Sequence, residues 1–132
     1  MSSHVFGMGI DLVDVAPLRR SLARYGNRIL RHVFTPVEIT RGSTKRDPAR
    51  FFAECFAVKE AAFKALGTGW QGELRWQDVA VGSAPGSSCL ALEGEFKRLA
   101  AESGVVDARV SFSSTSSVAC AVVVLSSKIE RP

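Results

Sequence analysis

The chain of 132 residues is long enough for one compact domain and too short for two ordinary ones, so we expect a single domain over residues 1–132. Seventeen Lys and Arg residues against thirteen Asp and Glu residues leave a formal net charge of +4, which fits an anionic partner such as nucleic acid, an acidic protein or a phosphorylated small molecule. The three cysteines form no CxxC pair and the two histidines are too few for a zinc site, a pattern typical of free thiols in the cytoplasm. We find no signal-peptide pattern, and the longest apolar run, at 118–125, is too short to span a membrane.

The N-terminal segment "HVFGMGIDLVDV" is rich in β-branched and large apolar residues, which predicts a strand. Alternation along a strand places Gly7, Gly9 and Asp11 on one face. The two glycines are then expected to leave room for a bulky group beside the Asp11 carboxylate. The alternative is an aspartate at a strand end that faces water, beside glycines that permit a bend.

A helix is predicted next, over residues 17–33, with Pro17 in its first turn and apolar residues at three- and four-residue steps. Gly26 weakens this helix without forbidding it. Arginines follow the same steps and form a second, cationic stripe, which is either a solvated face or a docking surface for an acidic partner. The residues of this arginine stripe are Arg20, Arg24, Arg28 and Arg31.

Two further helices have clear start signals. The sequence "TPVE" at 35–38 is a capping box, and the short helix that it begins is expected to end by Gly42. The polar, basic stretch "RGSTKRDP" is predicted to be a flexible loop. A long helix is predicted from about 48 to 66, with Gly67 as its C-terminal stop.

The C-terminal half combines strand and helix patterns. The segments "WQDVAVGS", "SCLALE", "ARVSFSST" and "VACAVVVL" are predicted strands, "EFKRLAAESG" is a predicted helix, and "SAPGSS" is typical of a turn between paired strands. Strands before, between and after helices, with at least one hairpin, favour an α+β domain over a doubly wound parallel sheet.

The long helix carries charged side chains within and beside its apolar stripe. Lys59 falls inside the stripe, so its ammonium must reach solvent or meet an anion. Glu60 and Lys64 lie one turn apart at the edge of the stripe, an arrangement that by itself describes an ordinary surface ion pair. If the strand that bears Asp11 packs beside this helix, two carboxylates and two ammoniums line one pocket, which suits Mg²⁺ together with a phosphate. The stripe itself consists of Phe52, Cys55, Phe56, Phe63 and Leu66.

Three motifs in this order, "GMGIDLVDV", "FAVKEAAFKALGTG" and a late serine-rich strand, resemble the holo-acyl-carrier-protein synthase family, the small 4'-phosphopantetheinyl transferases. The resemblance extends from about Gly7 to Leu125 and includes the "FTPVE" helix. It implies a mostly antiparallel sheet packed on a long central helix, in a homotrimer with its sites between subunits. The implied reaction transfers the 4'-phosphopantetheine arm of coenzyme A to a serine of an acidic acyl carrier protein, in fatty-acid, polyketide or peptide synthesis, and releases 3',5'-ADP.

The resemblance also implies roles for individual residues. Asp11 and Glu60 resemble the ligands of Mg²⁺, and Lys64 resembles the residue that meets the coenzyme A pyrophosphate and helps the leaving group depart. The base is either Glu60 or a metal-bound water. Gly67 is part of the motif at the cofactor, and the arginine stripe matches the place where the family docks the acidic helix of a carrier protein.

Two positions depart from the family pattern. Cys55 stands where relatives commonly have arginine, and Ser114 stands where they commonly have histidine, both at the coenzyme A phosphates. These departures leave open a second hypothesis, a non-catalytic or altered carrier-protein-binding module on the same scaffold. A third, a nucleic-acid-binding domain, rests on the basic charge balance alone and lacks a recognised motif. The side chains that are candidates to replace the lost phosphate contacts are Lys45, Arg46, Ser111 and Ser113.

Overall fold

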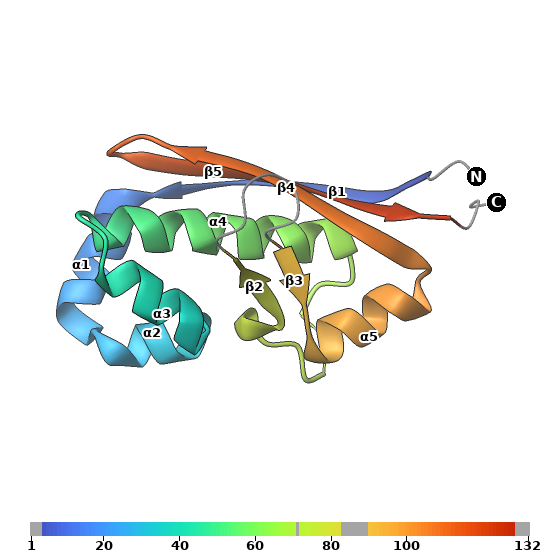
Figure 1. The fold of residues 1–132 in the computed structure, drawn as a ribbon, viewed down its shortest axis with the longest axis horizontal. Helices are drawn as coiled ribbons and strands as arrows, with labels where there is room; N and C mark the ends of the chain where they lie inside the picture. The colour runs from blue at the N-terminus through green and yellow to red at the C-terminus, as the bar shows by residue number, and fades with distance from the viewer. Residues whose placement is uncertain (1–3, 71, 83–89, 129–132) are drawn as a thin grey trace.

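The computed structural model describes residues 4–70, 72–82 and 90–128, and its helices and strands follow the α+β order that the sequence predicts (Figure 1). A single 3₁₀ turn, Trp76–Asp78, precedes β2 in the described part of the chain. The strands are β1 His4–Asp14, β2 Val79–Val81, β3 Leu90–Leu92, β4 Val105–Ser114 and β5 Val118–Ser127, and the helices are α1 Val15–Tyr25, α2 Asn27–Val33, α3 Pro36–Ser43, α4 Pro48–Leu66 and α5 Gly94–Glu102.

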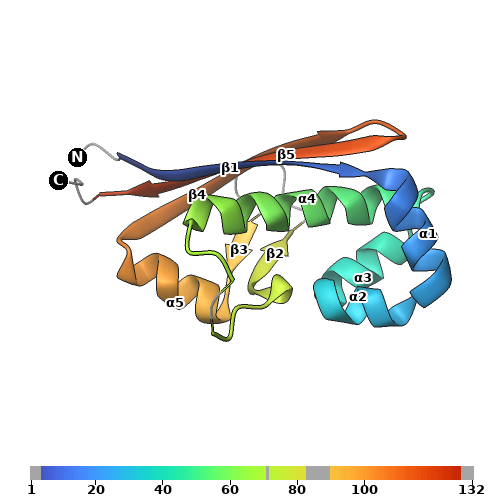
Figure 2. The ribbon, with the colours of Figure 1, turned by 180° about the vertical axis from the view of Figure 1, so that it is seen from behind.

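A three-stranded antiparallel sheet lies along one side of α4, with β5 in the centre and β1 and β4 at the edges (Figure 1 and Figure 2). The short β2–β3 pair and α5 lie on the other side of α4, so this helix is central to the fold. Alternate residues of β5 face α4 and are fully buried, which explains the nearly continuous apolar sequence of this strand. These buried residues are Ala119, Ala121, Val123 and Leu125.

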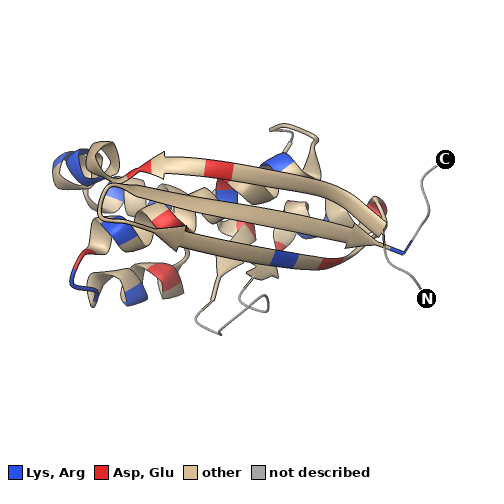
Figure 3. Ribbon diagram, turned by 90° about the horizontal axis from the view of Figure 1, so that it is seen from above, with Lys and Arg blue, Asp and Glu red and all other residues tan. Residues whose placement is uncertain are grey.

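The outer face of the sheet, turned away from α4, is apolar over β1 and β5, whereas β4 adds Arg109, Ser111 and Ser113 to the same side. Met8, Ile10 and Leu12 of β1 are 61%, 61% and 68% exposed, and they pair across the ladder with the half-buried residues Val124, Val122 and Cys120 of β5. Figure 3 shows that charged residues of this sheet lie only on its edge strands. We call these six residues the outer apolar face.

Close packing of β1 on α4 explains Gly7 and Gly9. A Cβ atom on Gly7 would overlap the carbonyl oxygen of Ala65, and one on Gly9 would overlap the carbonyl oxygen of Ala61. The backbone of α4 therefore fills the space beside the glycines, and the prediction that they leave room for a bulky group is wrong. Their function is to let strand and helix backbones touch.

The predicted single helix over residues 17–33 is two helices, α1 and α2, separated by Gly26. Gly26 adopts a φ of 51°, a left-handed conformation that favours glycine, and its N–H donates to the carbonyl of Leu22 to end α1. The first helix begins at Val15, which is fully buried, two residues before Pro17. The break divides the arginine stripe between two helices, so it is not one continuous row.

Helix α3 begins with the predicted capping box. Thr35 accepts a hydrogen bond from the backbone of Glu38, and the Glu38 carboxylate accepts one from the backbone of Thr35 at 2.9 Å. The helix ends at Ser43, one residue beyond the predicted end, so part of "RGSTKRDP" is helical rather than loop. Helix α4 begins and ends where predicted, and Gly67 has a φ of 78° as its C-terminal cap.

Lys59 is fully buried, and its anion is the equally buried Glu38. The ammonium lies 2.9 Å from Glu38 Oε1 and also donates to the carbonyls of Val79, at 2.6 Å, and Trp76, at 3.3 Å. Burial lowers the pKa of Lys59, while the Glu38 charge opposes this shift. Of the two alternatives for a lysine inside the apolar stripe, solvent or an anion, the structure shows the anion.

The C-terminal half contains the predicted strands and helix, although β2 and β3 are only three residues long each. They pair antiparallel, as expected for a hairpin, while the predicted turn "SAPGSS" lies outside the described residues. No helix among the described residues is both long and apolar enough to cross a membrane.

Candidate active site

Asp11, Glu60 and Lys64, the three residues that the sequence predicts to be catalytic, come together where β1 lies against α4. We call these three residues the catalytic cluster. Asp11 is on the helix-facing side of β1 and is 9% exposed. The Lys64 ammonium donates to Asp11 Oδ1 at 2.6 Å and to the carbonyl of Ile10 at 3.3 Å. The contact of Gly7 and Gly9 with the helix backbone brings the Asp11 carboxylate within reach of α4.

The two carboxyl groups of the catalytic cluster perturb each other. The pKa of Glu60 is raised to about 7, first because the group is partly buried and then because the negative charge of Asp11 lies beside it. Lys64 lowers the pKa of Glu60, and the pKa of Lys64 is itself raised, mainly by its hydrogen bond to Asp11. Two acidic groups therefore compete for one ammonium.

The Asp11 carboxylate has spare hydrogen-bonding capacity, because its Oδ2 is buried and lacks a hydrogen-bond partner among the described residues. A buried carboxylate oxygen without a partner is unfavourable, and a cation beside it removes that cost. Mg²⁺ is commonly bound by one or two carboxylates together with water and substrate phosphates, so Asp11 and Glu60 fit this ion. The described residues include no group of three or more His, Cys, Asp or Glu side chains that could hold a metal.

A second polar group, which sequence reasoning missed, joins the start of α4 to the end of β4. Arg50 donates from Nε to Ser114 Oγ at 2.8 Å and from a terminal nitrogen to the Ser114 carbonyl at 2.7 Å. The Ser114 hydroxyl donates to Glu54 Oε2 at 2.6 Å. The one signal in the sequence is the four-residue spacing of Arg50 and Glu54, which does not indicate a partner 60 residues away.

Cys55 is a buried thiol on the side of α4 that faces the interior, with 1% exposure. Burial raises the pKa of this thiol to about 12, so it stays protonated at neutral pH. Cys55 therefore provides neither a charge nor an accessible nucleophile at this position.

The predicted phosphate-binding residues lie in three places. Ser111 and Ser113 are exposed on the outer side of β4, whereas Asp11 is on the side that faces α4. Lys45 and Arg46 are exposed between α3 and α4, with the Lys45 ammonium 5.5 Å from the centroid of the Phe51 ring. Within one chain the structure does not bring these four side chains into the catalytic cluster.

All four residues of the arginine stripe are exposed, two on α1 and two on α2. None of them forms an ion pair with another described residue, although the neighbouring Arg19 pairs with Asp47 at 2.8 Å. Arg24 packs over the ring of Tyr25, with the guanidinium carbon 5.3 Å from the ring centroid. This end of the molecule therefore offers unpaired positive charge on two short helices.

Comparisons with known proteins agree with this architecture. The family model described as 4'-phosphopantetheinyl transferase superfamily matches residues 7–123. The holo-[acyl-carrier-protein] synthase of Solibacter usitatus is 37% identical over 122 residues, which is 92% of this chain and 98% of the relative. The crystal structure of the Neisseria meningitidis holo-[acyl-carrier-protein] synthase has a TM-score of 0.82 at 25% identity, covering 92% of this chain and 98% of that one. The Helicobacter pylori holo-[acyl-carrier-protein] synthase, solved in complex with coenzyme A, has a TM-score of 0.74 at 28% identity and covers 89% of this chain and 98% of that one.

The sheet on a long central helix and the match over most of the chain define a transferase of the 4'-phosphopantetheinyl type. Within that superfamily, the chain belongs to the holo-[acyl-carrier-protein] synthases. The family resemblance predicted from the sequence motifs is thereby confirmed.

Proposed function

We propose that this chain transfers the 4'-phosphopantetheine arm of coenzyme A to a serine hydroxyl of an acyl carrier protein. The observation that carries the proposal is the convergence of Asp11, Glu60 and Lys64 in a member of this family. The serine oxygen bonds to the phosphorus that bears the pantetheine arm, the bond from that phosphorus to the bridging oxygen breaks, and 3',5'-ADP leaves. We place the reaction in the cytoplasm, because Cys55 and Cys120 are free thiols.

Lys64 is the residue that we assign to the leaving group. Its ammonium is tethered to Asp11 at 2.6 Å while its side chain stays 56% exposed, so it can meet a phosphate without moving away from its partner. A positive charge held in place beside the pyrophosphate stabilises the negative charge that develops on the departing 3',5'-ADP. The serine proton passes to a base, for which Glu60 and a water molecule both stay candidates.

Asp11 and Glu60 are the residues that would hold Mg²⁺. The buried, unpartnered Oδ2 of Asp11 supports this assignment, as does the mutual repulsion of the two carboxylates. When bound, Mg²⁺ supplies positive charge that neutralises the pyrophosphate oxygens. The chain's own contribution is to keep both carboxylates at the junction of β1 and α4.

The phosphate contacts that Cys55 and Ser114 do not provide are proposed to come from elsewhere. Arg50 is held at Ser114 by two hydrogen bonds, so it is a candidate cation for the phosphate contact that Ser114 does not provide. The loop residues Lys45 and Arg46 are further candidates. Gly67, at the end of α4, is proposed to lie at the cofactor. We expect Arg50→Gln to raise the KM for coenzyme A, because a charge-assisted phosphate contact is lost.

A homotrimer with sites between subunits is part of this proposal. The outer apolar face supports it, because three exposed β1 side chains that are each about 60% exposed would be buried between copies. Ser111 and Ser113 face the same side and are therefore better placed to serve a neighbouring copy's site than their own. Analytical ultracentrifugation tests this part: wild type should sediment as a trimer and Ile10→Lys as a smaller species.

The arginine stripe is proposed as the docking surface for an acidic carrier protein. Four exposed arginines without ion pairs in the described structure support this assignment, since complementary charge mainly accelerates association. Reversing Arg24 and Arg28 to glutamate should raise the KM for the carrier protein and reduce its dependence on salt, with kcat little changed. No change in KM would contradict the assignment.

The central experiment is to incubate the protein with coenzyme A, Mg²⁺ and a panel of apo acyl carrier proteins, and to measure carrier mass. We expect the mass increase of one phosphopantetheine arm on at least one carrier. The absence of modification across the panel, with a competent synthase as positive control, would refute the proposal. Carrier binding by calorimetry without measurable coenzyme A affinity would instead identify the non-catalytic module that Cys55 and Ser114 left open.

A further inference from the structure

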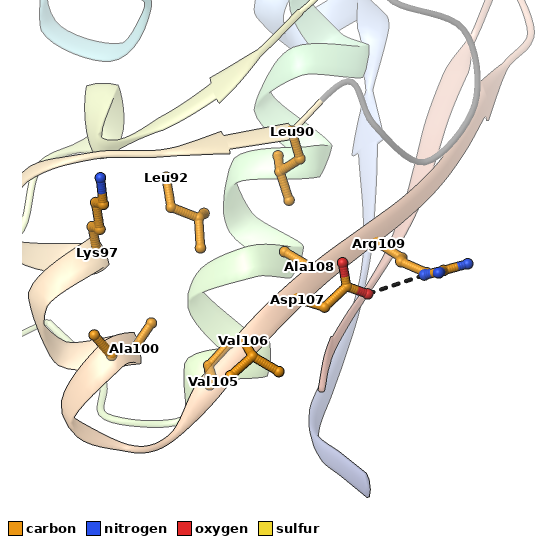
Figure 4. Close-up of a pocket in the computed structure, with 10 residues that line it drawn as sticks. Leu90, Leu92, Lys97, Ala100, Val105, Val106, Asp107, Ala108 and Arg109 are labelled. Atoms are coloured by element: carbon orange, nitrogen blue, oxygen red, sulfur yellow. Dashed lines mark hydrogen bonds and ion pairs between the residues drawn. The ribbon is translucent and has the colours of Figure 1, made fainter. Parts of the chain in front are cut away.

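A cavity of about 440 Å³ lies between β3, α5 and β4, and no residue of the catalytic cluster lines it (Figure 4). Its volume is within the range of about 300–1,000 Å³ that is typical of small-molecule sites. Leu90 and Leu92 extend into it from β3, Ala100 lines it on α5, and Val105 and Ala108 line it on β4. Apolar side chains therefore line the cavity on all three elements, and its charged lining residues are Lys97 on α5 and Asp107 and Arg109 on β4.

The charged residues around this cavity differ in whether they have an ion-pair partner among the described residues. Lys97 on α5 is exposed, lines the cavity beside β3 and forms no ion pair with a described residue. On the β4 side, Arg109 is neutralised by Asp107, with Nε 3.0 Å from Oδ2. The next residue along α5, Arg98, is bound by Glu95 and Glu102 and lies outside the cavity lining. One uncompensated ammonium thus remains at the edge of an apolar space.

We infer that this cavity binds an amphipathic monoanion, a medium-chain carboxylate, with its chain between the leucines and its carboxylate at Lys97. Burial of the alkyl chain against the apolar side chains supplies most of the free energy of binding. The carboxylate receives a charge-assisted hydrogen bond from the ammonium, which selects an anion over a neutral or cationic head group. The inference rests on the cavity and its charge alone, so it stands independently of the proposed transferase activity.

The test is a titration of the full-length protein with decanoate below its micelle-forming concentration, followed by amide NMR shifts. We expect saturable binding at one site per chain, with shifts in β3, α5 and the first half of β4. Decanol, which has the same chain without the charge, should bind about tenfold more weakly, and decyltrimethylammonium more weakly still. Shifts confined to the outer apolar face, no saturable shift, or decyltrimethylammonium binding as tight as decanoate would each overturn the inference.

Two variants separate the head-group contact from the apolar contact. Lys97→Gln should weaken decanoate about tenfold and leave decanol unchanged, whereas the matched control Arg98→Gln should leave both unchanged. Leu92→Asp should abolish binding of both probes, because it places a carboxylate in the apolar wall. Equal decanoate affinity in wild type and Lys97→Gln would overturn the inference; because Lys97 is exposed, this variant remains decisive even if Leu92→Asp fails to fold.

Discussion

Two lysine–carboxylate clusters are built on neighbouring residues of α4, and they differ in how fully their polar atoms are satisfied. Lys59 and Glu38 are fully buried, and between them they bond two backbone carbonyls and two backbone N–H groups. In the catalytic cluster, Lys64 is exposed and Asp11 keeps a buried oxygen without a partner among the described residues. The Lys59–Glu38 pair, whose polar atoms are hydrogen-bonded, joins α3, α4 and β2. The catalytic cluster, with an unpartnered oxygen on Asp11, retains the capacity to bind a ligand.

The largest effect on stability is expected from breaking the Lys59–Glu38 pair. Lys59→Met leaves the Glu38 charge buried without its counter-ion, which should lower the free energy of unfolding by about 3–5 kcal/mol. Urea denaturation measures this loss, with the exposed Lys97→Met as a control that should barely change the midpoint. Adding Glu38→Gln to Lys59→Met should recover part of the stability, because the unpaired charge is gone. A double variant less stable than the single one would contradict this account of the pair.

Breaking the catalytic cluster should affect activity instead of stability. Asp11→Ala and Glu60→Ala should each reduce carrier modification by at least about 100-fold, because each removes a charged group at the reacting phosphates. Thermal unfolding should show both variants as stable as wild type, or slightly more so, since one of two competing carboxylates is gone. Full activity in either variant would rule out the metal assignment.

The close contact between Gly9 of β1 and the Ala61 carbonyl of α4 is tested by Gly9→Ala. The added Cβ would overlap the Ala61 carbonyl and push β1 away from α4, at a cost of about 1–3 kcal/mol. Transfer should also fall, because Asp11 moves with the strand. The control is Ile10→Val, one residue further along and on the outer face. Retention of both stability and activity in Gly9→Ala would show that the contact is dispensable.

A change of pH is expected to have a smaller effect on the free energy of unfolding. In metal-free protein, the pKa of Glu60 is raised from 4.5 to about 7, so the folded state binds the proton more tightly than the unfolded state. The stability that this group contributes is therefore complete below pH 4.5 and is lost as the pH rises through 7. The measurement is the difference in unfolding free energy between wild type and Glu60→Gln in EDTA, which should decrease across this range. A difference that grows with pH would contradict the raised pKa.

Features whose signals lie close together in the sequence were predictable, whereas contacts between distant residues were not. The bounds of α4 and the capping box at Thr35 were predictable because their start and stop signals lie within one helical turn. Periodicity placed Lys59 inside the apolar stripe, but its partner Glu38 is 21 residues away and depends on how α3 packs. For the same reason, no pattern in the sequence joined Arg50 to Ser114.

Glycine was the residue type that the sequence left most ambiguous. At Gly26 the intrinsic penalty in a helix is only about 1 kcal/mol, so packing of α1 and α2 decided that the helix ends there. At Gly7 and Gly9 the absence of a side chain is compatible with an open space or with close contact, and only the neighbouring element distinguishes them. The strand and its polar face were predictable, but what fills the space beside it was not.

The contact of Gly7 and Gly9 with α4 also affects how this protein can change over evolutionary time. With no side chain between the two backbones there, the spacing from Asp11 to the helix that bears Glu60 and Lys64 has no adjustable spacer. The separation of Asp11 from the two α4 side chains is in this way set by contact between backbones, and no change in side-chain volume at a neighbouring position can make up for a Cβ added at either glycine.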